Sequence, residues 1–427
     1  MTTIVNEYDI GKKQQFTICD VNVGCILNVS NVDLGLAKAE ILQVQDNRYY
    51  VHFIEHNKRL DCWVSADSLD IQSIKLKIDN PNDNSTEQKY RSRQRKKSQS
   101  SSARRKRFQT ASNNSEKKAR KKSESGCKSK DEDKISEIKN IEMIQLGEHY
   151  IKPWYFSPYP KEISNCNVLY ICEFCLGFKT CESALQRHRT KCKLYCPPGV
   201  EIYRCENFSF FEVDGNFNCE YSHNLCLLAK LFLDHKTLYY ETDPFLFYVL
   251  TKTDNIGSHI IGYFSKEKQS KQDFNVACLL VLPPYQKMGY GRTLIEFSYA
   301  LTRKEGKQGT PEKPLSDLGL LSYCSYWSHA VISTILDYNK RCRTRNGDPT
   351  KISIGEICNQ TGMKKDDVTY ILQHLEVMYY DRGDVCIILD DELVQRHERQ
   401  KSTFRTSIDP TCFLGKWCST SKTLRQI

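Results

Sequence analysis

With 427 residues, the chain is too long for one ordinary domain, and we expect two or three. Its 39% hydrophobic and 27% charged residues, with a net charge of +10, are typical of a globular protein and exclude a wholly disordered one. No apolar run approaches the roughly 18 to 20 residues of a membrane helix, and the first residues lack a secretion signal. We therefore expect a soluble, intracellular protein without a membrane partner.

The 20 cysteines are expected to be reduced in such a protein. A disulfide scaffold is typical of short secreted chains, which leaves metal ligands, a catalytic thiol or packed core residues. A free cysteine behaves as a small hydrophobic residue, so we expect most of the 20 in the core.

Residues 21–70 have the pattern of a small all-β unit. Residues 39–45 alternate, residues 48–54 are β-branched and aromatic, and Asp46-Asn47 between them predicts a turn. Residues 62–64 predict a third strand. Short strands within about 50 residues indicate a small barrel.

The basic charge is concentrated in the segment that follows. Between Pro81 and Lys130 there are 17 Lys or Arg against 4 Asp or Glu, a net charge of +13, whereas the rest of the chain sums to −3. Residues 80–136 cannot bury enough apolar surface to offset chain entropy, which predicts a disordered linker. Arg93–Lys97 and Arg104–Arg107 are typical of nuclear-localisation or phosphate-binding segments; a plain solvated linker is the alternative.

From Ile141 onward the hydrophobic pattern is nearly continuous and indicates a large domain. Two short helices around Thr361-Gly362 outline a helix-turn-helix, for which DNA reading and simple packing are both open. The second helix has few cations, which favours packing. We predict helices near 225–233, 291–303, 318–338, 354–358 and 365–375, and strands near 245–251, 260–265, 274–282 and 385–389.

One cysteine and histidine pattern has the spacing of a zinc site. Cys172 and Cys175 are followed after twelve residues by His188 and after three more by Cys192. Two such pairs supply the four soft ligands that zinc favours in a tetrahedral, structural site, with no open position for catalysis. The nearby cysteines Cys166, Cys181, Cys196 and Cys205 are alternative ligands.

A glycine-rich turn follows the predicted strand 275–282. Residues 286–292 read Gln-Lys-Met-Gly-Tyr-Gly-Arg and lead into a helix. Glycines at 289 and 291 let backbone N–H groups converge at a helix N-terminus, a geometry that binds pyrophosphate. The turn is neither a Walker loop nor a Rossmann fingerprint, because the residues that complete those motifs are missing.

These residues resemble a known family. Gln-x-x-Gly-x-Gly after Val-Ala-Cys-Leu-Leu resembles the acetyl-coenzyme A loop of the Gcn5-related acetyltransferase fold. The zinc pattern and Asn57–Asp61 followed by Trp63 resemble, respectively, the C2HC finger of MYST-family histone acetyltransferases and the chromo-barrel (Tudor-knot) of their NuA4-type branch. Further stretches that resemble this family are 224–240, 243–248, 262–268 and 311–319.

The resemblance implies an α+β protein. A small N-terminal β-barrel and a disordered basic linker are expected before a zinc finger fused to a Gcn5-related N-acetyltransferase core, with a helix-turn-helix-like subdomain at the C-terminal end. The expected bounds are 18–75 for the barrel, 80–136 for the linker and 141–420 for the acetyltransferase domain. Within that domain we expect the finger at 168–196, the acetyl-CoA core at 220–340 and the subdomain at 350–395.

The resemblance also implies catalytic residues. Glu312 matches the family's general base, which the chemistry needs because a lysine amine has a reference pKa of about 10.4 and is not nucleophilic until deprotonated. Without the resemblance, Glu312 would be read as a helix cap or a partner of Lys313. Cys278 matches the active-site cysteine, which either forms an acetyl-enzyme or, as we favour, shapes the pocket for direct attack.

The cosubstrate acetyl-CoA and a lysine that the family acetylates on itself complete the implied site. Lys236 matches that lysine, with a surface lysine as the alternative. The residues expected to contact the cosubstrate are Leu279, Leu280, Val281, Gln286, Lys287, Met288, Gly289, Tyr290, Gly291, Arg292, Ser316 and Ser325.

Some positions depart from the family pattern. Cys62 stands where an acidic residue is usual, and Cys196 where a histidine is usual. The aromatic residues of the barrel are expected to be core rather than a methyl-lysine cage, because a cage needs ring faces open to solvent; they are Tyr49, Tyr50, Phe53 and Trp63.

The expected function is a nuclear histone acetyltransferase that acts on the tails of nucleosomal histones. Expected partners are nucleosomes, the subunits of a multiprotein complex, and DNA or RNA bound through linker and barrel. A chromatin-binding module with a degenerate acyltransferase domain is the alternative, which Glu312, Cys278 and the intact 286–292 loop argue against. A small-molecule N-acetyltransferase is disfavoured by the finger, the linker and the barrel.

Overall fold

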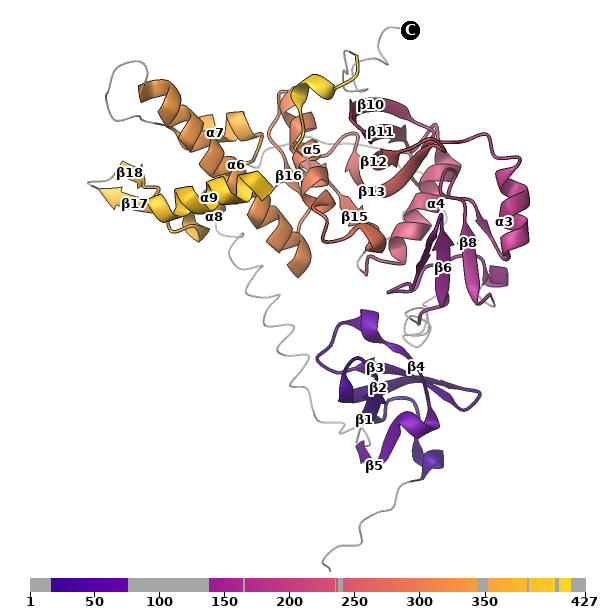
Figure 1. The fold of residues 1–427 in the computed structure, drawn as a ribbon. Coiled ribbons are helices and arrows are strands. Elements are labelled where there is room, and N and C mark those ends of the chain that lie inside the picture. Colours follow the sequence, from indigo (N-terminus) through magenta and orange to yellow (C-terminus); the bar gives the residue numbers. More distant parts are fainter. Residues whose placement is uncertain are drawn as a thin grey trace, which may run out of the picture. The chain divides into compact units, whose positions relative to one another are not determined.

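The computed structural model describes residues 17–75, 138–163, 166–234, 236, 241–343, 352–381, 384–403 and 407–415. The chain divides into two compact units, residues 1–138 and 139–427, and each is described by itself (Figure 1). The predicted linker 80–136 lies outside the described residues. Among the helices of the described ranges, none has the length and apolar character to cross a membrane.

The N-terminal unit is a five-stranded antiparallel sheet in the order β4-β3-β2-β1-β5. A two-residue turn at Asp46-Asn47 joins β2 to β3, and both residues have the positive φ that such turns need. The sequence predicted three of these strands and missed β1 and β5. The bounds are β1 Ile26–Asn31, β2 Gly35–Gln45, β3 Arg48–Phe53, β4 Cys62–Ser65 and β5 Leu69–Lys75, with 3-10 turns at Ile18–Asp20, Lys58–Leu60 and Ala66–Ser68.

The aromatic side chains of this sheet form its core. Tyr49, Tyr50 and Phe53 are at most 4% exposed, and half-buried Trp63 makes an edge contact with Tyr50 at a ring distance of 5.3 Å. Three of the four rings therefore have no face open to solvent, as expected for core residues.

The second unit begins with a small zinc-finger module. Its four-stranded sheet has the order β7-β6-β8-β9, with β6 and β8 parallel and the other pairs antiparallel. The elements are β6 Met143–Leu146, β7 His149–Ile151, β8 Val168–Ile171, β9 Phe178–Lys179 and α3 Glu182–Arg189, with a 3-10 turn at Lys161–Ile163.

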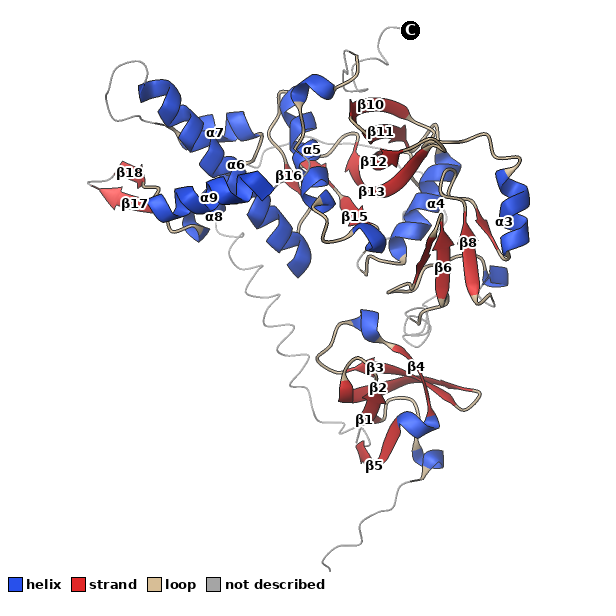
Figure 2. Ribbon diagram, in the orientation of Figure 1, coloured by secondary structure: helices blue, strands red, loops and turns tan. Residues whose placement is uncertain are grey.

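The centre of the unit is an antiparallel sheet in the order β10-β11-β12-β13-β15. Helices α4 and α5 cover opposite faces of this sheet (Figure 2). Successive β12 residues point to opposite faces, so Phe247 packs with α4 and Tyr248 with α5. The bounds are β10 Val200–Cys205, β11 Phe208–Asp214, β12 Phe245–Thr253, β13 Ser258–Glu267, β15 Cys278–Val281, α4 Cys219–Lys230 and α5 Tyr290–Lys304, with a 3-10 turn at Pro283–Tyr285.

The single strand predicted at 274–282 is wrong. The chain forms two strands, β14 at Phe274–Val276 and β15, separated by Ala277. Whereas β15 pairs with β13, β14 pairs in parallel with β16, Thr310–Pro311. The two strands diverge because they pair with different neighbours, which a continuous apolar run cannot reveal.

The C-terminal helices gather around α6 (Figure 1). Helix α7 starts with a capping box between Ser353 and Glu356 and ends at Gly362, whose φ of 74° is the left-handed conformation that stops helices. Buried residues of α5 to α8 form one apolar cluster, so the helices of the helix-turn-helix outline pack into the core of this unit. The bounds are α6 Asp317–Arg343, α7 Ile354–Thr361, α8 Lys365–His374, α9 Asp391–Thr403, β17 Met378–Asp381 and β18 Asp384–Ile387.

The last described segment returns to the first strand of the central sheet. Phe413, which follows a 3-10 turn at Pro410–Cys412, forms an antiparallel bridge with Tyr203 of β10. Its ring stacks on Phe297 of α5 at 5.4 Å, and Phe297 stacks on Phe210 at 3.7 Å. The segment thereby covers an aromatic part of the core.

Candidate active site and zinc centre

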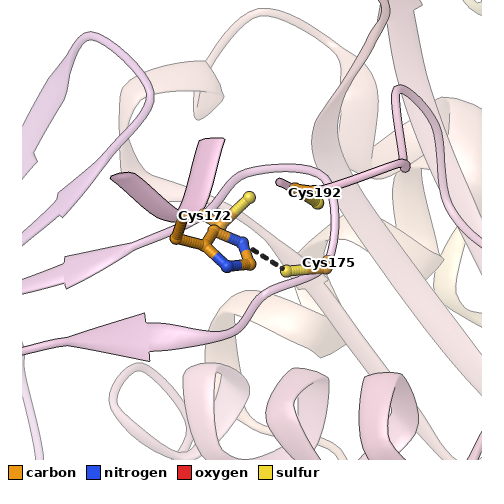
Figure 3. A group of neighbouring side chains, drawn as sticks. Cys172, Cys175 and Cys192 are labelled. Atoms are coloured by element: carbon orange, nitrogen blue, oxygen red, sulfur yellow. Dashed lines mark hydrogen bonds between the residues drawn. The ribbon is translucent and has the colours of Figure 1, made fainter. Parts of the chain in front are cut away.

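The four predicted zinc ligands meet at one point. Cys172 and Cys175 lie between β8 and β9, His188 is on the last turn of α3, and Cys192 follows that helix. Their ligand atoms all lie within 4.8 Å of one another, and Figure 3 shows the three cysteine side chains gathered around one imidazole. In the described part of the chain, the four alternative cysteines are not members of this group, so these alternatives are wrong; they are Cys166, Cys181, Cys196 and Cys205.

The donors in this group fit a zinc ion. Three thiols and one imidazole within tetrahedral reach are the donor set of a closed structural site. The Cys175 sulfur is 3.2 Å from His188 Nε2 and accepts from the Gly177 N–H at 3.4 Å, while Arg189 Nη1 donates to the Cys172 sulfur at 3.5 Å. Such donors favour thiolates, the form that binds metal.

A histidine joins the zinc-finger module to the central sheet. His259 of β13 contacts Glu173, between two ligands, at 2.7 Å and Asp254 at 3.0 Å. Burial alone would lower the pKa of His259, but these two carboxylates raise it above its usual value.

The predicted active-site cysteine lies at the start of β15, where this strand separates from β14. The Cys278 N–H donates to the Ser265 hydroxyl at 3.2 Å, and Lys236 Nζ donates to the Cys278 sulfur at 3.6 Å. Lys236 is half-buried, so the alternative of a surface lysine is wrong.

The surroundings of Lys236 stabilise its ammonium. Burial lowers its pKa, but Tyr263, Cys278 and Cys226 raise it more, and the pKa lies above the usual value for lysine. Burial also raises the pKa of the Cys226 thiol. The Lys236 ammonium is therefore favoured beside Cys278.

Glu312 follows β16 and is exposed. Its backbone N–H donates to the carbonyl of Val276, two residues before Cys278, at 2.9 Å. In the described ranges its carboxylate forms no hydrogen bond or ion pair, because Lys313 pairs instead with Asp367 at 2.8 Å. The alternative that Glu312 pairs with Lys313 is thus not realised, and the carboxylate is available to a substrate.

The glycine-rich turn forms an open cradle at the start of α5. Gly289 is the N-cap of this helix with a φ of 95°, and nothing lies within 4 Å of where its Cβ would be. Outside helices and strands, no described carbonyl accepts from the backbone N–H of Met288 or Gly289. Unused donors at a helix N-terminus suit the pyrophosphate of acetyl-CoA. Gln286 closes the turn by donating to the Val281 carbonyl at 2.9 Å.

Arg292, in the first turn of α5, packs against α6. Its guanidinium lies over the Tyr326 ring, 5.5 Å from the centroid. Burial lowers the pKa of Arg292, and the Glu296 carboxylate opposes that shift. His329 nearby has its pKa lowered to about 3 by burial and by the charge of Arg292, so the histidine adds no second charge.

The other predicted cosubstrate residues belong to β15, to this turn and to α6 with the residue before it. Leu279, Leu280 and Val281 form most of β15, and Lys287, Met288, Tyr290 and Gly291 belong to the turn and the first residues of α5. Ser316 accepts from the Gly319 N–H at 3.1 Å, and Ser325 is exposed on α6.

Two residues of the site were missed by sequence reasoning. Tyr263 of β13 pairs with Leu280 of β15 and interacts with Lys236. Asp367 binds Lys313 across 54 residues of sequence. A tyrosine in an apolar strand and an aspartate in the first turn of a helix are ordinary in a sequence, so neither position gave a signal.

Family descriptions match nearly all of the described chain. "MOZ/SAS family" matches residues 196–413, "MYST family zinc finger domain" matches residues 138–192, and "RNA binding activity-knot of a chromodomain" matches residues 21–71. Along the chain, the three matches cover in turn the N-terminal sheet, the finger module and the central sheet with the C-terminal helices.

Curated relatives are similar over most of their length. The Caenorhabditis elegans protein "Histone acetyltransferase Tip60 homolog" is 44% identical over 384 residues, 85% of this chain and 82% of its own. "Histone acetyltransferase mst1" of Schizosaccharomyces pombe is 41% identical over 416 residues, 87% and 88%. "Histone acetyltransferase ESA1" of Saccharomyces cerevisiae is 38% identical over 405 residues, 88% and 89%.

Proposed function

Because this chain belongs to the MYST family of histone acetyltransferases, we propose that Glu312 is the general base of its acetyl transfer. The family, the α+β fold class and the zinc ligands are confirmed. Acetyl-CoA supplies the acetyl group as a thioester. The observation that carries the proposal is the exposed Glu312 carboxylate, which has no partner among the described residues.

Glu312 takes a proton from the substrate lysine. The lysine amine attacks only when neutral, and its reference pKa of about 10.4 leaves few neutral molecules at pH 7. The hydrogen bond from the Glu312 backbone to Val276 ties this residue to the strand that leads into Cys278. The proposed base is therefore attached by its backbone close to the start of β15.

Cys278 shapes the pocket in this proposal, and the amine attacks the thioester carbonyl directly. The C–N bond forms, the C–S bond breaks, and coenzyme A leaves as its thiol. The Cys278 sulfur contacts the Lys236 ammonium, which is the lysine we propose for self-acetylation. The β15 backbone, the 286–292 turn, Ser316 and Ser325 hold acetyl-CoA, with the pyrophosphate at the Gly289 cradle and beside Arg292.

The substitution Glu312→Gln tests the base. Its volume is unchanged, so we expect unchanged acetyl-CoA affinity and a fall in kcat of about 10² to 10⁴ at pH 7. Steady-state rates on a histone-tail peptide should show this loss shrinking as pH rises, because the amine then deprotonates without help. A loss that stays constant with pH contradicts the base and indicates positioning.

Histone tails of nucleosomes are the proposed substrates, which places the protein on chromatin and in the nucleus. The basic segment 80–136 and the N-terminal sheet are proposed to contact nucleic acid, and further subunits to complete a complex. The similarity to proteins named histone acetyltransferases supports the substrate class. A mass-spectrometric map of lysines acetylated on nucleosomes tests it, and acetylation confined to non-histone proteins contradicts it.

A further inference from the structure

The segment that carries Glu312 is held from two sides. On one side β16 pairs in parallel with β14, and the Glu312 N–H donates to the Val276 carbonyl. On the other side Gly309, just before β16, bridges Met363 in the turn between α7 and α8 and donates its N–H to the Gly362 carbonyl at 2.8 Å. The α7–α8 turn is therefore part of the support of this segment.

The backbones approach closely at Gly309. A Cβ at this position would lie 2.9 Å from the Asn275 Cβ of β14, closer than real side chains come. The Gly309 carbonyl also accepts from the Lys364 N–H at 3.3 Å. The start of the segment has little room to move.

An ion pair to a buried aspartate holds the segment on the far side of Glu312. Lys313 Nζ donates to Asp367 Oδ1 at 2.8 Å, and the side chains are 53% and 2% exposed. Asp367 lies in the first turn of α8, and its Oδ2 is buried without a partner among the described residues. A carboxylate buried this deeply depends strongly on its cation.

Glu312 thus lies between two attachments to the α7–α8 unit. Gly309 is attached three residues before it, and Lys313 is attached immediately after it. The pair also holds the Lys313 ammonium on Asp367, which leaves the neighbouring Glu312 carboxylate without a cation.

On the premise that Glu312 is the base, we propose that Asp367 is a positioning residue of acetyl transfer. It acts through Lys313, and it touches neither substrate nor acetyl-CoA. The α7–α8 unit then holds the segment that carries the general base in position. Positioning matters because misplacement of a reacting group by about 1 Å can cost roughly 100-fold in rate.

The variant Asp367→Asn tests this in the full-length protein, with acetyl-CoA varied up to saturation and a histone-tail peptide held saturating. We expect kcat to fall about tenfold, as a partial misplacement should, while the KM for acetyl-CoA stays unchanged because the cradle at Gly289 is untouched. Asp366→Asn is the matched control, since it removes an equal charge from the same helix turn at an exposed position. An equal loss of kcat in both variants overturns the proposal.

Three further variants separate positioning from stability. Lys313→Met should lose as much kcat as Asp367→Asn, the double variant should lose no more than either, and Lys313→Arg should keep the rate. Since Lys313 is half exposed, its variants stay informative if Asp367→Asn folds poorly. Additive losses in the double variant overturn the proposal.

The Glu312→Gln background distinguishes this inference from its premise. If Asp367 acts through Glu312, Asp367→Asn should lower kcat in the native chain and leave the residual rate of Glu312→Gln unchanged. The same fold-loss in both backgrounds overturns the positioning role and leaves the base intact. An undiminished rate in Glu312→Gln itself overturns the base.

Discussion

The zinc-finger module and the α7–α8 unit are held together by different kinds of contact. The finger holds its chain with four ligands that are close in sequence, and its helix α3 has no buried residue. The α7–α8 unit has no such ligand group among its described residues and depends on buried side chains, including Ile357, Val368 and Ile371, from separate helices.

The difference separates two sources of stability. The strands of the finger module pack into the apolar core, but helix α3 buries no residue of its own, so this helix and the ligand loop rely on the metal for their order. The α7–α8 unit relies on burial, at about 25 cal/mol for each Å² of apolar surface. Loss of metal and loss of apolar volume should therefore disable different parts of the protein.

Removing a zinc ligand should have the largest effect. Cys175→Ser or His188→Ala should lower both the zinc content and the soluble yield, because structural zinc contributes on the order of 10 kcal/mol in isolated fingers. Metal analysis and expression level measure the two effects. Cys181→Ser, at an exposed cysteine outside the group, should change neither, and full metal content in both ligand variants would contradict the assignment.

Cutting apolar volume in α8 should have the next largest effect. Ile371 is fully buried, and Ile371→Ala should cost about 2 to 5 kcal/mol of unfolding free energy while zinc content stays complete. Chemical denaturation compares it with Gln373→Ala, an exposed position on the same helix. Zinc loss in the Ile371 variant would show that the two regions are not independent.

The smallest effect concerns the contact between the finger and the sheet. Because Glu173 and Asp254 raise the pKa of His259, the folded protein binds its proton more tightly than the unfolded chain, whose value is about 6.5. The stabilisation is complete below that pH and disappears as pH rises through the higher folded-state pKa. Since solvent screens the contacts of His259 with the two carboxylates, we expect them to contribute about 0.2 to 1 kcal/mol to the free energy of unfolding.

The measurement is the difference in unfolding free energy between the native chain and His259→Gln, both loaded with zinc. This difference should decline as pH rises above about 6.5. A difference that grows with pH would contradict the raised pKa.

Local patterns predicted the fold where they were complete within a few residues. The Asp46-Asn47 turn and the helices beside Gly362 are formed by neighbouring residues. The break at Ala277 was not predictable in this way. It arises because β16, more than thirty residues later, draws β14 away from the sheet.

The same distinction applies to the site. Zinc ligands were found because their spacing reflects the chemistry of one ion, and the 286–292 turn because glycines mark its backbone. Asp367 and the partial burial of Lys236 depend on contacts across 54 and 42 residues. Single side chains at such separations leave no periodic signal.

The return of Phe413 to Tyr203 has a consequence for synthesis. The two residues are 210 positions apart, so the aromatic stack under β10 stays incomplete until residue 413 has left the ribosome. At roughly 5 to 20 residues per second, this interval lasts about 10 to 40 s. During that time the Tyr203 ring lacks the cover of Phe413, and so does the Phe297 ring once it has been made. A chaperone that binds aromatic side chains on nascent chains could bind there.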